Sequence, residues 1–506
     1  MRNKIAIKNS SIGIISQIVT MCCSFITRRF FVQYLGMEVL GVNGVISNIL
    51  SMLQLTELGI GVAIIYALYQ PIVDKDERTI AALMNLYKRF YNIIAIVVLS
   101  LGVFISFFLK YFITTELSMS YVRIIFYIQL AGTLVTYLLA YRRNLMYADQ
   151  RQYVCTLIDM FINIVGSVFR IIILIVTQNY LLYLGISLIQ NLMSNILISI
   201  KCYKDYPFLK KYKNEKYDKT SELLKDVKDL FFSKIGGFIY SSTDNILISK
   251  FVGVLSVGLL SNYSLLTSSC KTVINSLTSA LQPIMGNYVR IQTDKKEIKK
   301  IFYVNTLVRF LIVNVCVVGI IVLADDVVGI WLGKDDIFMG VSVPILLCID
   351  LYIHNVHGPV VELLSVLGYF NFDKKITFMG VIINLGISII MLQFWGVQGV
   401  LFGTAIAQIY YWSVRGWKLF KDYFQAAAWR YVFRNLCYIV LTAFQVIFAF
   451  WVKGMIVNKI CIANFVIMGC IIVLICGLCD LVILFMTDEG KYLLGVAKNL
   501  LKKRNF

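Results

Sequence analysis

The segment SIGIISQIVTMCCSFITRRFFVQ, residues 11–33, determines the class of fold. It can cross a bilayer, because a membrane helix needs about 20 predominantly apolar residues. It also carries Arg28 and Arg29 inside the apolar run, where a charge costs about 3 kcal/mol or more. Such charges usually face a wet interior. The segment therefore predicts a membrane helix that lines a polar path.

The same pattern recurs along the whole chain. Hydrophobic residues make up 59% of the 506 positions, and the mean hydropathy is +0.78, whereas soluble domains are about 45–50% apolar. We predict an all-α integral membrane protein with about fourteen transmembrane helices. The predicted spans are residues 11–33, 42–70, 87–109, 121–141, 154–177, 180–201, 230–252, 257–289, 302–324, 341–365, 376–392, 397–416, 433–452 and 461–486.

The distribution of charge predicts the orientation. The chain has 48 Lys and Arg against 28 Asp and Glu, a net charge of +20. Most of the basic residues lie between spans, in segments that share a side of the membrane with the N-terminus. Cytoplasmic loops carry such an excess, so we expect both termini to be cytoplasmic. Because topology accounts for the basic charge, nucleic acid is not an expected partner.

The two halves of the chain repeat. When residues 31–90 are compared with residues 251–310, the D-K-x-E motifs at Asp74 and Asp294 coincide, and an N-x-x-x-R-F motif follows each. An even number of spans separates the halves, which predicts two six-helix lobes in a parallel repeat about a pseudo-two-fold axis along the membrane normal. The predicted parts are an N-lobe at 1–201, a basic cytoplasmic linker at 202–229, a C-lobe at 230–416, and helices 13 and 14 with a basic tail at 417–506.

Several segments resemble those of a known family, the polysaccharide repeat-unit (Wzx-type) flippases of the multidrug/oligosaccharidyl-lipid/polysaccharide exporter superfamily. The segment TELGIGVAIIYALYQP, residues 56–71, resembles the second span of that family. The segment RRFFVQYLG at 28–36 resembles the end of the first span. TDNILIS at 243–249 with SNY at 261–263 resembles the seventh span and its exit. NLGIS at 384–388 with GVQGVLFGT at 396–404 resembles the eleventh and twelfth spans.

The resemblance implies a flippase of the bacterial cytoplasmic (inner) membrane. Its cargo would be an undecaprenyl-diphosphate oligosaccharide, the repeat unit of a capsule or other surface polysaccharide, moved from the inner to the outer leaflet. Two lobes would alternate around a central cavity without a cofactor, with coupling to an H⁺ or Na⁺ gradient left open. Membrane lipid, a polysaccharide polymerase and a chain-length regulator are the candidate partners. A monomer is expected, since one chain with two lobes can form the pathway.

Cationic residues inside the spans are the candidates for cargo binding. The headgroup of such a lipid needs a hydrated, cationic route through hydrocarbon. Arg forms paired, charge-assisted hydrogen bonds with phosphate, and Lys adds a point charge. We expect Arg28 or Arg29, Arg170 and Lys271 to bind the cargo. Because Arg28 and Arg29 lie about 100° apart on a helix, one of them should face the cavity. Snorkelling, or an ion pair between helices, is the alternative role.

Acidic residues within the spans are the candidates for gating or coupling. Glu57 and Asp244 lie near the middle of the second and seventh predicted spans. They would pair with the cationic residues, bind a coupling proton or cation, or cap a polar network, and we favour pairing. Asp159 and Arg309 lie nearer the inner ends of their spans and are expected at the interface.

The tenth predicted span carries a second candidate for gating. Asp350, His354 and His357 have the i, i+4 and i+7 spacing that can place three side chains on one helix face. We expect Asp350 and His354 to form a polar cavity wall or a pH-sensitive gate. His and carboxylate groups also bind metals, but no second cluster completes a coordination shell, so no metal is predicted.

Other activities are weighed against the same residues. A peptidoglycan-precursor flippase and a cation-coupled multidrug exporter share the implied fold. Multidrug members usually have twelve spans, and cationic residues within the spans favour an anionic cargo over a cationic drug. The peptidoglycan flippase has fourteen spans, so the span count does not exclude this alternative. An enzyme such as a polysaccharide polymerase is not expected. The predicted outer loops are short, and no Gly-rich phosphate loop, H-E-x-x-H or Ser/His/Asp arrangement stands out.

Overall fold

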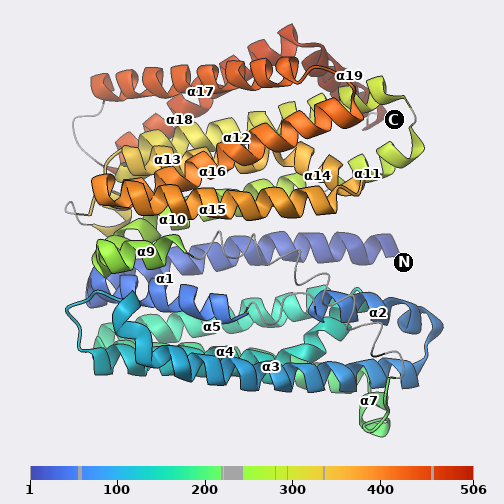
Figure 1. The fold of residues 1–506 in the computed structure, drawn as a ribbon, viewed down its shortest axis with the longest axis vertical. Coiled ribbons are helices and arrows are strands. Elements are labelled where there is room, and N and C mark those ends of the chain that lie inside the picture. Colours follow the sequence, from blue (N-terminus) through green and yellow to red (C-terminus); the bar gives the residue numbers. More distant parts are fainter. Residues whose placement is uncertain are drawn as a thin grey trace. The chain divides into compact units, whose positions relative to one another are not determined.

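The protein is helical throughout the part of the chain that the structure describes. The computed structural model describes residues 2–54, 60–217, 220, 243–279, 281–292, 294–333, 337–456 and 461–504. Within these ranges the secondary structure consists of helices without a strand, which confirms the all-α prediction. The chain forms two compact units, Met1–Gly258 and Leu259–Phe506, which follow one another along the colour scale of Figure 1.

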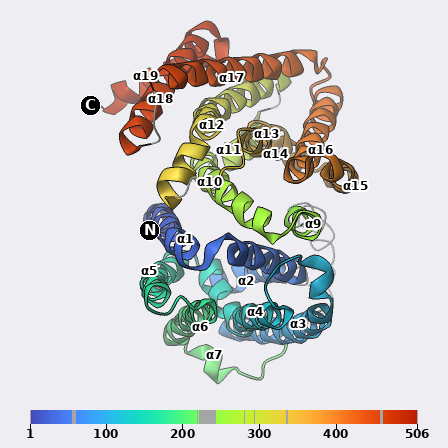
Figure 2. The same ribbon diagram turned by 90° about the vertical axis from the view of Figure 1, so that its left-hand side faces the viewer.

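The first unit contains six of the long helices and several short ones among its described residues. Helix α4 packs against α3 and α6, and α5 packs against α1 and α6; α3 and α4 run side by side in Figures 1 and 2. The helices are α1 (Arg2–Leu53), α2 (Ile60–Asp74), α3 (Glu77–Phe112), α4 (Met119–Ala148), α5 (Gln152–Thr177), α6 (Tyr180–Asp205), α7 (Phe208–Lys211), α9 (Asp244–Phe251) and the start of α10 (Val254–Thr278).

Helix α1 is bent at Gly36, which has φ 82° and ψ 178°. Beyond the bend, the start of α10 lies against α1, because a Cβ atom on Gly41 would overlap the carbonyl group of Val254. A Cβ atom on Gly258 would overlap the carbonyl group of Met37 in the same way. Glycine lets membrane helices approach this closely. This contact joins α9 and the start of α10 to the first unit, although both follow the linker that the sequence predicts at 202–229. Residues 218, 219 and 221–229 of that linker lie outside the described residues.

The second unit has three clusters of buried side chains. Within the described residues, one cluster lies between α12, α13 and α17 around the stacked rings of Phe310 and Tyr438, another around Phe302 and Phe420, and the third around Val318 and Met468. Figure 2 shows α12, α17 and α18 together. The helices after α10 are α11 (Leu281–Ile291), α12 (Lys295–Leu332), α13 (Ser342–Val356), α14 (Gly358–Val366), α15 (Phe370–Trp395), α16 (Val397–Lys418), α17 (Trp429–Ile456), α18 (Ile462–Met486) and α19 (Asp488–Arg504), with a π-helical turn at Leu419–Tyr423.

Helices α15 and α16 form the tightest helical pair of the second unit. They meet at Gly396, whose φ of 55° and ψ of −125° suit glycine. The Ser388 hydroxyl donates to the Val400 carbonyl oxygen (3.1 Å), and Asn384 Nδ2 donates to Thr404 Oγ1 (2.9 Å). A Cβ atom on Gly403 would overlap Ser388. The segments 384–388 and 396–404, which resemble family motifs, therefore hold this hairpin together.

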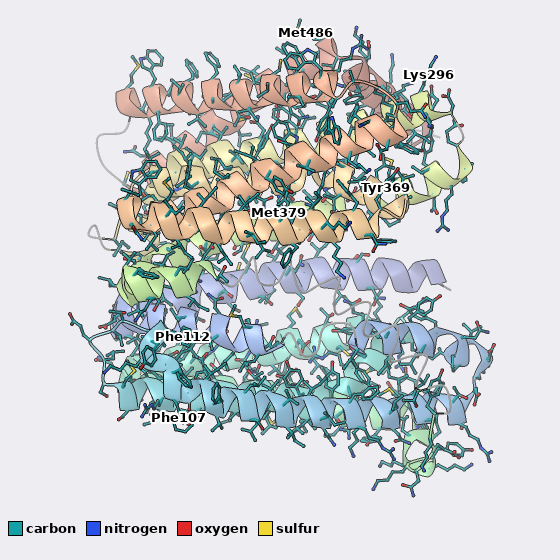
Figure 3. The ribbon with its side chains drawn as sticks, in the orientation of Figure 1. Phe107, Phe112, Lys296, Tyr369, Met379 and Met486 are labelled. Atoms are coloured by element: carbon teal, nitrogen blue, oxygen red, sulfur yellow. The ribbon has the colours of Figure 1, made fainter. Side chains whose placement is uncertain are left out.

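The outer surfaces of the helices are apolar. Phe107 and Met379 are exposed on α3 and α15, as Figure 3 shows with side chains drawn. Ten helices in the described ranges are long and apolar enough to cross a membrane. Helices α10 and α16 fall outside this set, because Ser, Thr, Asn and Gln interrupt their apolar residues. Half of the seventh predicted span, 230–242, lies outside the described residues, so the number fourteen stays a prediction.

Candidate functional site

A polar hollow of about 420 Å³ opens within the first unit. The part of α1 after its bend, together with α4, α5 and α6, forms its walls. Amide and hydroxyl groups dominate the lining, and one arginine is the single charged side chain among the lining residues: Asn43, Ser47, Leu50, Ser51, Gln54, Ile128, Gln129, Gly132, Thr133, Thr136, Arg170, Tyr183, Leu184, Ser187, Leu188 and Asn191. A hollow of this size and polarity, formed by membrane helices, is suited to a hydrophilic ligand.

Hydrogen bonds fix one wall of this hollow. Asn43 Oδ1 on α1 accepts from Gln129 Nε2 on α4 (2.9 Å) and from the Tyr180 hydroxyl on α6 (2.8 Å). The Phe31 ring stands edge-on to the ring of Tyr180, with 5.4 Å between the centroids. Three helices are therefore joined at one point, which holds the remaining amide and hydroxyl groups in fixed positions before a ligand arrives.

Arg170 is the cationic residue of the hollow. Its Nη2 donates to Ser167 Oγ (2.9 Å), its Nε donates to the Gly166 carbonyl oxygen (3.3 Å), and its guanidinium lies 5.6 Å from the ring centroid of Tyr183. No ion pair between described residues includes Arg170. A guanidinium held by neutral partners inside a membrane protein keeps its attraction for an anion. The sequence prediction for Arg170 is therefore compatible with its position.

Arg28 and Arg29 have different surroundings. Arg28 is half-buried and lies close enough to Tyr183 for an electrostatic interaction. Arg29, on the next residue, is exposed. Tyr183 therefore links Arg28 of α1 with Arg170 of α5, and of the two neighbouring arginines Arg28 is the one directed toward α6.

Only one of the two acidic candidates of the first unit lies within the described residues. Asp244 is the first residue of α9 and is half-buried. Glu57, with residues 55–59, lies outside the described residues, so its pairing or coupling role stays a prediction.

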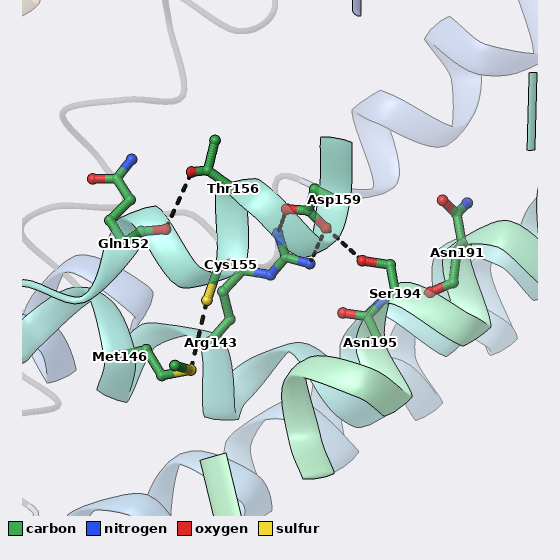
Figure 4. A network of polar contacts seen from close by, with 9 residues as sticks. All are labelled: Arg143, Met146, Gln152, Cys155, Thr156, Asp159, Asn191, Ser194 and Asn195. Carbon is green, nitrogen blue, oxygen red and sulfur yellow. Dashed lines mark hydrogen bonds and ion pairs between the residues drawn. The ribbon is translucent and has the colours of Figure 1, made fainter. Parts of the chain in front are cut away.

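A half-buried polar network ties α4, α5 and α6 together. Arg143 Nη1 and Asp159 Oδ2 form an ion pair of 2.5 Å, and Ser194 also donates to Asp159; Figure 4 shows this network. The neighbouring Arg142 donates to Ser199 and Tyr203. The helix predicted to end at residue 141 therefore continues to Ala148, and both arginines contact adjacent helices from its last turns.

In the second unit, two of the predicted gating residues lie near Lys271. The His354 ring on α13 interacts electrostatically with Lys271 on α10 and with Asp350 one turn earlier on α13. Gln408 Nε2 on α16 donates to Asp350 Oδ1 (2.5 Å). Lys271 and Asp350 are half-buried, and His354 is exposed. A cation of α10 therefore lies near a carboxylate and an imidazole of α13, and Gln408 of α16 is bonded to the carboxylate.

The sequence spacing places His357 on one helix face with Asp350 and His354, but the two histidines have different surroundings. Helix α13 ends at Val356, and His357 is the residue that caps it. Its side chain is buried, and Nδ1 lies 3.0 Å from the Tyr431 hydroxyl, to which Trp412 Nε1 also donates. Within the described residues, no group of three or more His, Cys, Asp or Glu is placed to hold a metal ion.

Arg309 is buried in protein and paired, although the sequence placed it near the interface. Its side chain is 5% exposed, and its Nη2 lies 2.5 Å from Glu362 Oε1 on α14. Asn305 Oδ1 accepts from Arg309 Nε at 3.1 Å. This closed ion pair joins α12 to α14 and has a structural role.

Sequence reasoning missed the neutral residues of the hollow. Asn43, Ser47, Ser51 and Gln54 recur at three- or four-residue spacing after Gly36, which places them on one helix face. This stripe is the signal that could have found the wall on α1, but a polar stripe in a membrane helix also fits a helix contact.

Comparison with known proteins places the chain in a family. Residues 6–289 match the polysaccharide biosynthesis protein family. No curated protein matches the chain in sequence. In structure, the chain is similar to the lipid II flippase MurJ in an inward closed conformation, with a TM-score of 0.68, 13% identity, and coverage of 93% of this chain and 98% of the other.

Two multidrug transporters have a similar fold. The inward-facing conformation of a multidrug resistance MATE family transporter of the MOP superfamily matches with a TM-score of 0.59 and 14% identity, covering 80% of this chain and 96% of the other. A mutant of the Vibrio cholerae MATE transporter VcmN matches with a TM-score of 0.53 and 15% identity, covering 83% and 97%. The chain is thus a multi-pass membrane protein with the fold of MOP superfamily transporters, and it belongs to the polysaccharide biosynthesis protein family.

Proposed function

We propose that the protein is a flippase that moves a lipid-linked oligosaccharide, an undecaprenyl-diphosphate repeat unit, from the inner to the outer leaflet of a bacterial cytoplasmic membrane. The observation that carries the proposal is the polar hollow with Arg170 among membrane-crossing helices. Arg170 supplies charge for a diphosphate, and the amide and hydroxyl groups of the hollow suit sugar hydroxyls. The product would serve synthesis of a capsule or another surface polysaccharide, in keeping with the family.

The transport cycle that fits this fold is alternating access. The similar MATE structures bear the names inward-facing and outward-facing, and a chain with two repeated halves can alternate in this way. In this proposal Arg28 and Arg170 hold the phosphate groups, and Lys271 adds a second cationic contact. Asp350 and His354 form a polar wall beside Lys271, and Glu57 and Asp244 pair with cations or bind a coupling H⁺ or Na⁺.

A peptidoglycan precursor is the second candidate for the cargo. The likeness to the lipid II flippase covers 93% of the chain, against 80–83% for the two MATE transporters named above. Lipid II also has a diphosphate and sugars on a polyprenyl chain, so the chemistry of the hollow suits it equally. The two cargoes are separated by which lipid accumulates when the protein is missing.

The test is a gene deletion complemented with variants. The deletion strain is assayed for surface polysaccharide and for lipid-linked repeat units on the inner leaflet, then complemented with wild type, Arg170→Ala or Arg123→Ala. We expect polymer loss with repeat units trapped inside, rescue by wild type, and no rescue by Arg170→Ala at normal protein level. Arg123 is exposed at the start of α4, so Arg123→Ala should rescue. Normal polymer in the deletion strain overturns the proposal, and accumulation of lipid II instead selects the second candidate.

A further inference from the structure

A second hollow, of about 580 Å³, lies in the second unit where several helices end. Tyr303 of α12, Arg430 and Arg434 of α17, and Glu489 of α19 line its polar part, and Leu441 and Ile483 line its apolar part. The first turns of α17 and the junction of α18 with α19 therefore meet here. By the distribution of basic residues this end of the helices is the cytoplasmic one.

The cations around this hollow outnumber the anions. Arg434 is already paired with Glu489. Arg430 is exposed and lies close enough to Lys299 of α12 for the two cations to repel each other. No ion pair between described residues includes Arg430, Lys299 or Lys300. Lys299 is not among the lining residues, and its ammonium lies 5.4 Å from the ring centroid of Phe420. Two neighbouring cations without an acidic partner attract an anion from outside the chain.

The hollow also has a hydrogen-bond donor without a protein partner. The Tyr303 hydroxyl is buried and has no partner among the described residues, while its ring lies 4.9 Å from the guanidinium of Arg434. Lys299 and Lys300 precede Tyr303 by one turn of α12, so these side chains share a helix face. A buried hydroxyl left without a hydrogen-bond partner is destabilising, and an external acceptor would supply that partner.

The apolar part of the hollow identifies the kind of anion. Leu441 and Ile483 lie deeper in the membrane-crossing helices, and Phe433 and Cys437 are exposed along α17 toward the same side. A ligand that fills the site must therefore be anionic at one end and apolar at the other. Basic pockets between membrane helices on the cytoplasmic side bind lipid headgroups in this way.

We propose that this hollow is a binding site for an anionic phospholipid, such as phosphatidylglycerol, with its phosphate between Arg430, Lys299 and the Tyr303 hydroxyl and its acyl chains along Leu441 and Ile483. The site lies within the second unit and uses none of the residues assigned to the cargo. It requires only that the protein spans a membrane, so it stands whether or not the cargo is an oligosaccharide lipid.

The experiment measures lipid binding to the purified full-length protein in neutral detergent by native mass spectrometry. Phosphatidylglycerol is compared with phosphatidylcholine, and inorganic phosphate is added in a separate arm. The test variants are Arg430→Gln with Lys299→Gln, and Tyr303→Phe. The control is Lys88→Gln with Lys204→Gln, which removes two exposed lysines of the first unit on the same predicted side.

We expect tight, stoichiometric binding of phosphatidylglycerol. Each basic residue near a membrane surface contributes about fivefold to binding of anionic lipid, so the double variant should bind about 25-fold more weakly. Tyr303→Phe should bind about tenfold more weakly with unchanged thermal stability, because it loses one hydrogen bond to a charged group. The lysine control should bind as wild type does. The proposal is overturned if the control weakens binding equally, if phosphatidylcholine binds as tightly, or if inorganic phosphate alone displaces the lipid at millimolar concentration.

Discussion

The helices α3 to α6 of the first unit and α12 to α16 of the second have the same order but enclose different interiors. Helices α3 and α12 have 36 and 38 residues, and α5 and α15 have 26 each. The hollow of the first unit is polar, whereas a hollow of about 520 Å³ beside α12, α13, α16 and α17 is lined almost wholly by apolar side chains. The two units therefore share the order and lengths of these helices, whereas residues outside the repeated motifs determine the polarity of each hollow.

One pair of matching positions shows a further difference between the two units. Counted from the helix starts, Arg170 on α5 has the place of Ser388 on α15. Ser388 bonds to α16 and lets Gly403 pack against it, which closes the space between the two helices. Arg170 is too large for such a contact and lies beside an open hollow instead. At matching places in the two units, one side chain therefore bonds to the neighbouring helix and the other lines a hollow.

The largest expected effect concerns the repeated N-x-x-x-R-F motif. Arg309→Gln should destabilise the protein by about 3–5 kcal/mol, because it leaves Glu362 partly buried without its counter-ion. Arg89→Gln, at the matching position of the first half, should change stability by no more than about 0.5 kcal/mol, because Arg89 is exposed. Thermal unfolding of the purified protein in detergent measures both.

A further variant sharpens this pair. Arg309→Gln combined with Glu362→Gln should recover part of the loss, because neither side chain then remains as an unpaired charge. Equal destabilisation by Arg309→Gln and Arg89→Gln would mean that the arginine has the same role in both halves, which would contradict the pairing of Arg309 and the exposure of Arg89 in the structure.

The next effect concerns the closed helix pair. Gly403→Ala should cost about 1–3 kcal/mol, because the added Cβ atom overlaps Ser388 and the Asn384 carbonyl oxygen. Gly386→Ala is the matched control, since nothing lies within 4 Å of a Cβ atom there, and it should be neutral or stabilising by up to about 1 kcal/mol. If both alanines behave alike in thermal unfolding, the close approach of α15 and α16 is not what holds this pair.

A smaller effect is expected in the open hollow and rests on the proposed function. Arg170→Lys keeps the charge but removes the planar fork that binds phosphate through two hydrogen bonds. We expect transport of the lipid-linked oligosaccharide into the outer leaflet to fall about tenfold, with unchanged protein level and melting temperature. Arg123→Lys should transport as wild type does. An Arg170→Lys protein with full transport would mean that Arg170 acts only as a point charge.

The sequence predicts the scaffold better than it predicts the contacts. Apolar length alone identifies α5 and α15, and Asp294 caps α12 where the D-K-x-E motif falls, its side chain accepting from the Lys296 amide. The sequence does not predict that α4 continues to Ala148, because two consecutive arginines, Arg142 and Arg143, are typical of a loop. Their partners, Ser199 and Asp159, lie on neighbouring helices and become known only from the structure.

The candidate site was predictable only where it is charged. Arg170 interrupts an apolar run and so stands out, whereas Asn43 and Gln129 are neutral and common in membrane helices. Their role in the wall of the hollow depends on Tyr180, which is distant in sequence but donates a hydrogen bond to Asn43 in the folded helix bundle. The spacing of Asp350, His354 and His357 does not predict that His357 is buried against Tyr431 of α17, because that partner lies far along the chain.

The smallest expected effect lies beyond the repeat, where α19 returns to α17. Burial alone would raise the pKa of Glu489, but the hydrogen bonds from Arg434 outweigh it and hold the pKa below its ordinary value of 4.5. Because the folded protein has the lower pKa, the stabilisation is complete above pH 4.5 and is lost as the pH falls through the lowered value. The pair is partly exposed, so we expect no more than about 1 kcal/mol. Wild type should melt above Glu489→Gln near neutral pH, and this difference should shrink toward about pH 3; a difference that stays constant would mean that Glu489 stabilises the α17–α19 contact without its charge.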